Sequence, residues 1–267
     1  MNNTTTNKKP LTLDEKREIQ LRMLDEVDAF CRKNDIRFSL ACGTLLGAIR
    51  HKGFIPWDDD MDIMMPREDL EKFKRLFSSD TVSYIDINNW PFYPFATSKI
   101  VNTSTYSIPG KIVKGFGVDI DLYPIHPLPA DKQFVSVFLS RGERIRKRRL
   151  PFMKWRSRFI RRFPIKTILG YSYMMRKHYN QVYSYPFPTN NVGYYFVNSG
   201  EMDWAHTYDY DLFEQMIDIQ FEGHTYMAIS SWDKYLTQRY GNYMELPSED
   251  KRHPYHGGVF YRKKIEP

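Results

Sequence analysis

The stretch Gly43–Pro66, GTLLGAIRHKGFIPWDDDMDIMMP, constrains what this chain can fold into more than any other segment. Residues 43–49 are a glycine-threonine turn followed by a short apolar run, which predicts one or two helical turns. The hydrophobic segment 54–57 then leads to four closely spaced aspartates, and the apolar residues 63–65 predict a strand that ends at the proline. We therefore expect a helix, an approach loop and a strand that begins with acidic residues.

Three of the aspartates are expected on one face of that strand. Side chains alternate along a strand with a period of two, so Asp58, Asp60 and Asp62 share a face. Neighbouring carboxylates repel one another unless a cation neutralises them. Oxygen ligands suit a hard divalent ion, Mg²⁺ or Mn²⁺, which proteins often share with substrate phosphates. A solvated acidic turn is the alternative, but the flanking hydrophobic segments argue against it, and the pattern predicts a metal site.

The segment GTLLGAIRHKGFIPWDDDMDI resembles the signature of the LicD-type phosphotransferases, whose relatives include the fukutin-related proteins. The resemblance extends over most of residues 13–258. It implies an α/β (α+β) nucleotidyltransferase-type fold with a mixed sheet flanked by helices, in a single domain, 13–267, after a flexible tail, 1–12. In the superfamily pattern a Gly-Ser or Gly-Gly turn precedes an Asp-x-Asp, and here the turn has threonine in the hydroxyl position.

The resemblance also implies a third carboxylate, from a separate strand, that serves as metal ligand and general base. The segment Gly117–Pro124 places Asp119 and Asp121 on one strand face. The family pattern fits best through Asp121, and the role of Asp119 stays open. The resemblance thus assigns catalysis to Asp60, Asp62 and Asp121, and metal binding to these three together with Asp58.

Six other residues are candidates for substrate binding. Backbone amides of a glycine-threonine turn at a helix N-terminus can bind phosphates. A lysine inside a strand matches the family pattern and could neutralise phosphate charge, although composition alone equally fits a surface lysine. The basic and histidine-containing tail resembles the family's C-terminal pattern, where a purely structural role is the alternative. The candidates are Gly43, Thr44, Arg50, Lys99, Arg252 and His256.

The rest of the chain shows ordinary signals for helices, strands and turns. Thr12 and Glu15 form a capping-box pattern before a helix that begins near residue 13. Gly241 is expected to end a late helix. The remaining expectations are strands at 37–41, 82–87, 96–101, 106–108, 117–123 and 193–197, a hairpin over 219–229 about Glu222-Gly223, and helices starting at Pro66 and over 167–183 and 231–240.

Residues 141–166 contain twelve lysines and arginines against one glutamate, within a chain whose net charge is +7. Aromatic and aliphatic residues interleave with these charges, and the whole insert is expected over about 141–183. A solvated basic helix and a nucleic-acid contact are alternatives, but no nucleic-acid module accompanies the segment. The composition favours an amphipathic element at an anionic membrane surface.

Cysteine content and hydropathy indicate the compartment. The chain has only two cysteines, so a disulfide framework is not expected and a reducing cytoplasm fits. Of these, Cys42 beside the glycine-threonine turn is expected to be a core residue and not a catalytic thiol. We find no signal peptide and no apolar run of membrane-spanning length. The expected location is cytoplasmic, with peripheral attachment to the inner face of the membrane.

The resemblance implies transfer of a phospho-alcohol from a CDP donor to a hydroxyl of a cell-surface glycan or teichoic acid precursor, with release of CMP. CDP-choline is the first choice of donor, and CDP-ribitol and CDP-glycerol remain open. A lipid-linked glycan is a plausible acceptor. The alternatives are nucleotidyl transfer, which releases pyrophosphate, and a membrane-associated glycan-binding protein with a vestigial site.

Overall fold

The computed structural model describes residues 9–90, 97–107, 116–128, 173, 176–177, 180, 191–194, 207–254 and 258–263. The expected basic insert at 141–166 lies outside these residues. The helix expected over 167–183 is described only at residues 173, 176–177 and 180, which are helical. Within the described chain no helix is both long enough and apolar enough to cross a bilayer.

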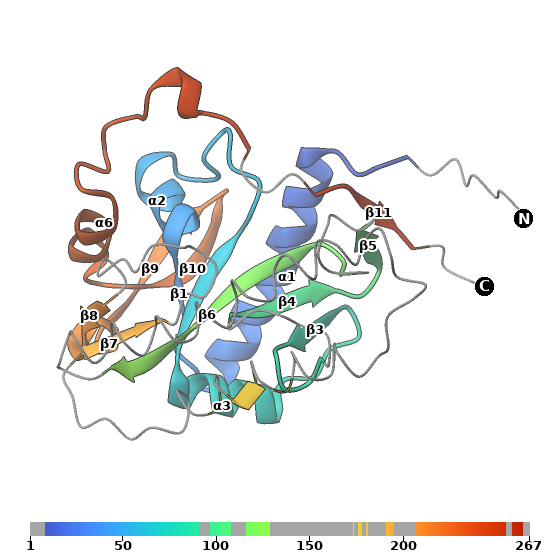
Figure 1. Ribbon diagram of the computed structural model, residues 1–267, viewed down its shortest axis with the longest axis horizontal. Helices are drawn as coiled ribbons and strands as arrows, with labels where there is room; N and C mark the ends of the chain where they lie inside the picture. Colours follow the sequence, from blue (N-terminus) through green and yellow to red (C-terminus); the bar gives the residue numbers. More distant parts are fainter. Residues whose placement is uncertain are drawn as a thin grey trace, which may run out of the picture.

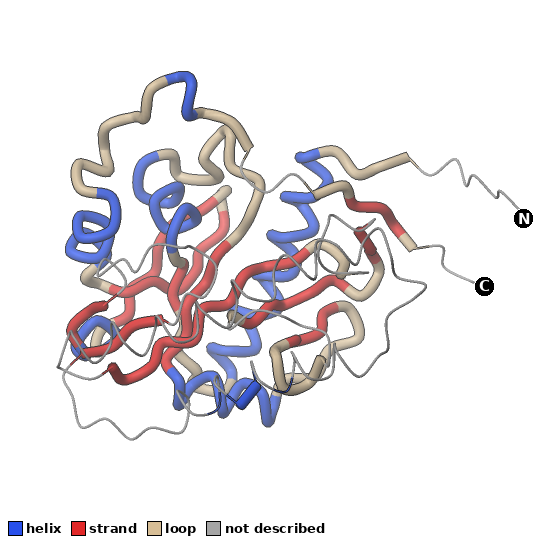
Figure 2. The backbone as a smooth tube through the Cα atoms, in the orientation of Figure 1, coloured by secondary structure: helices blue, strands red, loops and turns tan. Residues whose placement is uncertain are grey.

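A seven-stranded mixed sheet lies at the centre of the described chain (Figures 1 and 2). Its two central strands are parallel, and every other neighbouring pair is antiparallel. The strand order is β1 (Ser39–Leu40), β2 (Asp62–Pro66), β6 (Asp119–Leu128), β4 (Ser98–Asn102) and β3 (Val82–Ile85), with β7 (Asn191–Tyr194) beside β6 and β8 (Thr207–Asp209) beside β7.

Two small antiparallel pairs complete the strands. β9 (Met216–Phe221) and β10 (His224–Ile229) form the expected hairpin, and its two turn residues, Glu222 and Gly223, both have positive φ. This geometry is that of a type I′ turn, whose twist matches the flanking strands. β5 (Thr105–Ser107) pairs with β11 (Phe260–Arg262), so segments far apart in sequence lie side by side.

Helices pack against the sheet and the hairpin. α1 (Leu13–Lys33) contacts β4, β6 and β10, and α3 (Arg67–Leu76) contacts β2 and β6. α2 (Cys42–Arg50) contacts β2, β9 and α6 (Trp232–Tyr240). Short 3₁₀ turns cover Tyr210–Phe213 and Glu249–Lys251. The mixed sheet with flanking helices confirms the fold class expected from the resemblance.

The helix ends follow the predicted signals. Thr12 and Glu15 form both hydrogen bonds of the capping box at the start of α1, at 2.8 and 3.2 Å. Pro66 precedes α3, and Gly241, with a φ of 65°, ends α6. Apolar side chains of α1 and of the central strands, such as Leu24, Val27 and Ile63, are fully buried in one core.

One expectation about the acidic segment was wrong. The strand expected from Asp58 begins only at Asp62, and residues 58–61 form a loop. Side chains of α1 supply the reason, because Arg17 donates hydrogen bonds to the carbonyls of Ile55, Pro56 and Asp58 at 3.0, 3.2 and 2.7 Å. Backbone groups bonded to side chains in this way do not need a neighbouring strand.

Candidate metal centre and active site

The two parallel central strands bring carboxylates from distant segments together. Asp62, the first residue of β2, is in register with Asp121 on β6. Asp60, in the loop before β2, completes a group in which one carboxylate oxygen from each residue lies within 4.8 Å of the others. Asp58, Asp59 and Asp60 form a second group that meets the same distance limit. The geometry therefore favours Asp121 over Asp119 as the third carboxylate.

Electrostatics in this cluster favour a bound cation. Burial raises the pKa of Asp62 well above its usual range, and the charges of Asp60, Asp121 and Asp58 raise it further. Burial also raises the pKa of Asp121, while the ammonium of Lys99 opposes that shift. Because ionised carboxylates in such a site repel one another, a divalent ion would stabilise their charged forms. The donor set, made of oxygen ligands only, suits Mg²⁺ or Mn²⁺.

Lys99 lies at this site, directly across from Asp121 in the β4–β6 pair. Its ammonium group is 2.7 Å from Asp121 Oδ1 and also forms an ion pair with Asp119. The structure thus shows Lys99 bound to carboxylates at the edge of the cluster that could hold a metal ion. Its expected role in binding phosphate stays a prediction.

Gly43 and Thr44, which lie near the start of α2, position the acidic residues. The hydroxyl oxygen of Thr44, which is buried, accepts a hydrogen bond from the Asp62 backbone N–H at 2.8 Å. A Cβ at Gly43 would lie only 2.5 Å from Asp58 Oδ2, so any larger residue would displace that carboxylate from its position. The two residues therefore have a structural task in addition to the predicted phosphate binding, which stays a prediction.

The approach loop before the acids is fixed by contacts that the sequence analysis missed. Arg17 lies over the Phe54 ring, 4.8 Å from its centre, besides holding the loop carbonyls. Lys16 donates to the Asp59 carbonyl, and the Glu222 carboxylate at the β9–β10 turn accepts the Phe54 N–H at 2.8 Å. These partners are 37 to 168 positions apart, and no local sequence pattern predicts such contacts.

Tyr123 is another residue that the sequence analysis did not assign to the site. Its hydroxyl donates to Asp62 Oδ1 at 3.3 Å. Burial raises the pKa of Tyr123 well above its usual value, so the phenol keeps its proton and remains a donor. The alternation that places Asp121 and Tyr123 on one face of β6 was the available signal. From α6, the charge of Arg239 opposes the upward shift of the Asp62 pKa.

Arg50 and Arg252, two of the remaining predicted binding residues, are held by main-chain carbonyls and not by the carboxylate cluster. Arg50, at the end of α2, donates to the carbonyls of Tyr243 and Glu245 at 2.7 and 3.2 Å. Arg252 donates to the Pro247 carbonyl at 2.8 Å. His256 lies outside the described residues.

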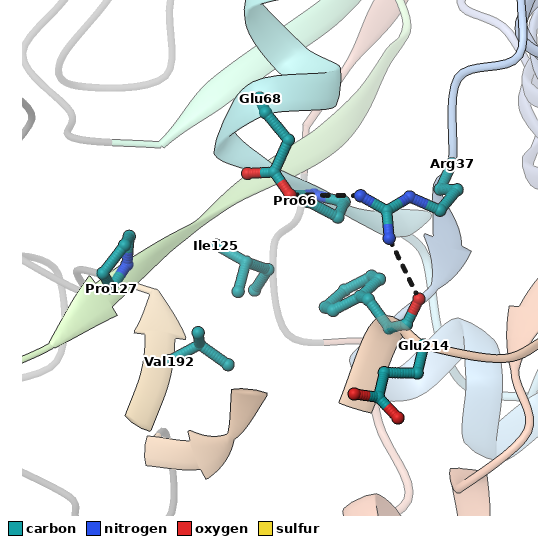
Figure 3. A pocket seen from close by; sticks show the side chains of 8 residues that line it. Arg37, Pro66, Glu68, Ile125, Pro127, Val192 and Glu214 are labelled. Carbon is teal, nitrogen blue, oxygen red and sulfur yellow. Dashed lines mark hydrogen bonds and ion pairs between the residues drawn. The ribbon is translucent and has the colours of Figure 1, made fainter. Parts of the chain in front are cut away.

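A hollow at the other end of β2 and β6 does not serve as a substrate site (Figure 3). Its volume is about 40 Å³, which suits water rather than a nucleotide. The guanidinium of Arg37 beside it is already bound by Asp69 at 2.7 Å and by Glu68 at 3.1 Å. The lining residues are Arg37, Pro66, Glu68, Ile125, Pro127, Val192, Phe213 and Glu214.

The fold and the carboxylate cluster show the arrangement that the resemblance implies: a glycine near the start of a helix, an Asp-x-Asp at the next strand, and a third acid on the parallel neighbour. Residues 35–141 match the family described as LicD/FKTN/FKRP, nucleotidyltransferase domain. This match confirms the resemblance seen in the sequence.

Individual relatives extend this comparison along the chain. The chain is 28% identical over 259 residues to lipopolysaccharide cholinephosphotransferase LicD of Haemophilus influenzae, covering 93% of this chain and 97% of that protein. It is 29% identical over 92 residues to human ribitol 5-phosphate transferase FKRP, covering 34% of this chain and 17% of that protein. A Rickettsia prowazekii protein described as uncharacterized, RP689, is 40% identical over 70 residues, 24% of this chain and 26% of that protein.

Proposed function

We propose that this protein is a metal-dependent phosphotransferase that moves a phospho-alcohol from a CDP donor onto a glycan hydroxyl and releases CMP. The proposal rests on one observation: the carboxylates of Asp60, Asp62 and Asp121 lie close together where the parallel strands β2 and β6 are paired. CDP-choline is the preferred donor, because the relative that matches almost the whole chain is a cholinephosphotransferase. The acceptor is a cell-surface glycan, such as a lipopolysaccharide or a teichoic acid precursor.

Within this proposal the carboxylates would hold Mg²⁺ or Mn²⁺. Asp60, Asp62 and Asp121 are the ligands, and Asp58 is close enough to Asp60 to join them. Such an ion would supply positive charge to neutralise the phosphoryl group during transfer. Thr44 and Tyr123 would keep Asp62 in place through its amide and its carboxylate.

Asp121 would also act as the general base. A general base must be ionised before it can accept the proton of the acceptor hydroxyl. The ammonium of Lys99, 2.7 Å from Asp121 Oδ1, favours the ionised form and holds the carboxylate in one orientation. Gly43 and the N-terminal end of α2 would receive the donor phosphates.

The donor can be tested by isothermal titration of CDP-choline, CDP-ribitol, CDP-glycerol and ATP, each with and without Mg²⁺. We expect Mg²⁺-dependent binding of CDP-choline. If a different CDP-alcohol bound instead, the proposed donor would change, but the proposed reaction class, transfer of a phospho-alcohol, would remain. If ATP alone bound, nucleotidyl transfer with release of pyrophosphate would replace the proposal.

Attachment to a membrane is a further part of the proposal and rests on the composition of residues 141–166. Their arginines and aromatic residues would place the active site at a lipid-linked acceptor on the inner face of the cytoplasmic membrane. Liposome flotation tests this point. We expect the protein to float with vesicles that contain anionic lipid, and failure to float with any vesicle would exclude the attachment.

A further inference from the structure

Two arginines from distant parts of the chain meet beside Trp57. Arg50 ends α2, and Arg252 follows the 3₁₀ turn Glu249–Lys251. The guanidinium carbon of Arg252 lies 5.5 Å from the centre of the Trp57 ring. His51 packs edge-to-face on the same ring, at 6.1 Å, and its Nε2 accepts a hydrogen bond of 2.9 Å from Arg50 Nε. The four side chains thus form one continuous surface.

These arginines are held by main-chain carbonyls and not by carboxylates. Arg50 binds two carbonyls of the segment after α6, and Arg252 binds the Pro247 carbonyl. Within the part of the chain that the structure describes, neither forms an ion pair, whereas Arg32 and Arg37 both bind aspartates. Carbonyl groups fix a guanidinium without cancelling its charge, so two positive charges are kept close together.

Their electrostatics agree with this description. Burial lowers the pKa of Arg50, Tyr240 opposes this shift, and the positive charge of Arg252 adds to it. Guanidinium groups offer several N–H donors in a planar fork that matches phosphate oxygens. Only some of these donors are used by the carbonyls. An anion between the two arginines would relieve their repulsion.

This surface begins beside the carboxylate cluster, because Trp57 directly precedes Asp58, and it extends to the C-terminal end of α2. Gly43, near the first turn of α2, lies against Asp58, whereas Arg50 is the last residue of that helix. A rise of 1.5 Å per residue places the two ends of α2 roughly 12 Å apart. Because the two phosphates of a CDP donor are directly linked, both belong at the metal end. An anion that contacts both Arg50 and Arg252 is then more readily supplied by a second molecule.

We propose that Arg50 and Arg252 form an anion site for a phosphate group carried by the acceptor. This inference rests on the proposed function, since it names the acceptor of that reaction. The site would select glycans with a phosphate near the hydroxyl that receives the phospho-alcohol. Trp57, which lies between Arg252 and Asp58, would pack against the bound glycan.

Inorganic phosphate, titrated into the metal-free protein, tests the site without any need for turnover. Hydrogen bonds to charged groups contribute about 1.5–3 kcal/mol, so Arg252→Gln should weaken phosphate binding about 10- to 100-fold. Arg252→Lys should recover part of the affinity. Arg75→Gln, at an exposed arginine of α3, serves as the charge-matched control and should bind phosphate like the wild type.

Arg50 needs a milder substitution because it also anchors two carbonyls. Arg50→Lys keeps the charge, and a melting curve shows whether the fold is retained. We expect weaker phosphate binding without a large change in melting temperature. Phosphate affinity equal to that of the wild type in both Arg252→Gln and Arg50→Lys would overturn the proposal.

Steady-state kinetics show whether the site binds the acceptor or the donor. With a phosphorylated glycan acceptor, Arg252→Gln should raise the acceptor KM about 10-fold or more while donor KM and kcat stay near wild-type values. An increase in donor KM alone would show that the site binds the donor and would overturn the acceptor assignment. If phosphate bound as predicted but no CDP-alcohol reacted, the proposed function would fail while the anion site remained.

Discussion

Asp60→Asn is expected to abolish phospho-transfer and, at the same time, to raise the melting temperature of the metal-free protein. The substitution keeps the shape of the side chain but removes one charge from the carboxylate group. Loss of a metal ligand should cost several kcal/mol of transition-state stabilisation, or at least about 10³-fold in rate. Asp62→Asn should have the same effect on rate.

The gain in stability follows from the pKa of Asp62. Burial and neighbouring acids raise the pKa of Asp62 in the folded state above its unfolded value. Ionised Asp62 therefore destabilises the metal-free fold at neutral pH, and this cost disappears as the pH falls through the folded pKa toward about 4, the unfolded value. Asp60→Asn removes part of the repulsion, so its advantage over the wild type should shrink across the same interval.

Thermal melts in EDTA at several pH values measure this effect. Asp80→Asn, at an exposed aspartate outside the cluster, is the control and should change neither melting temperature nor rate appreciably. A metal-free Asp60→Asn protein that is less stable than the wild type at neutral pH would contradict the electrostatic description. Wild-type turnover in either Asp60→Asn or Asp62→Asn would refute the metal assignment.

The second large effect is expected for Asp121→Asn. Asparagine cannot remove the proton from the acceptor hydroxyl, so transfer should fall at least about 10³-fold, because loss of the general base is combined with a weakened metal site. Donor binding should persist, because Asp60 and Asp62 remain. Lys99 should stay in place through its ion pair with Asp119.

Asp119→Asn is the matched control for this prediction. Asp119 lies on the same strand, two residues away, and pairs with the same lysine, but it is not part of the carboxylate cluster with Asp60 and Asp62. We expect Asp119→Asn to retain most of the rate. A larger loss in Asp119→Asn than in Asp121→Asn, measured as kcat at saturating donor, would move the third carboxylate to Asp119.

Local signals in the sequence were sufficient for several elements. The capping box at Thr12, the glycine at the end of α6 and the Glu222-Gly223 turn depend on neighbouring residues and were predicted correctly. The grouping of Asp60 and Asp62 with an acid of the segment 119–121 came from the family resemblance, since no local rule joins strands that far apart.

Contacts between distant residues could not be predicted from the sequence. Arg17 donates hydrogen bonds to carbonyls of the approach loop, and for this reason β2 starts at Asp62 and not at Asp58. The position of Arg252 over Trp57 depends on the path of the chain after α6. Tyr123 is the exception, because strand alternation beside Asp121 would have indicated it.

Manganese binding, followed by the electron paramagnetic resonance signal of free Mn²⁺, tests the central claim most directly. We predict that the wild-type protein removes Mn²⁺ from solution, that CDP-choline tightens this binding, and that the double variant Asp60→Asn/Asp62→Asn removes little. Equal free Mn²⁺ in the presence of wild-type and double-variant protein, with and without CDP-choline, would contradict a metal centre at these carboxylates.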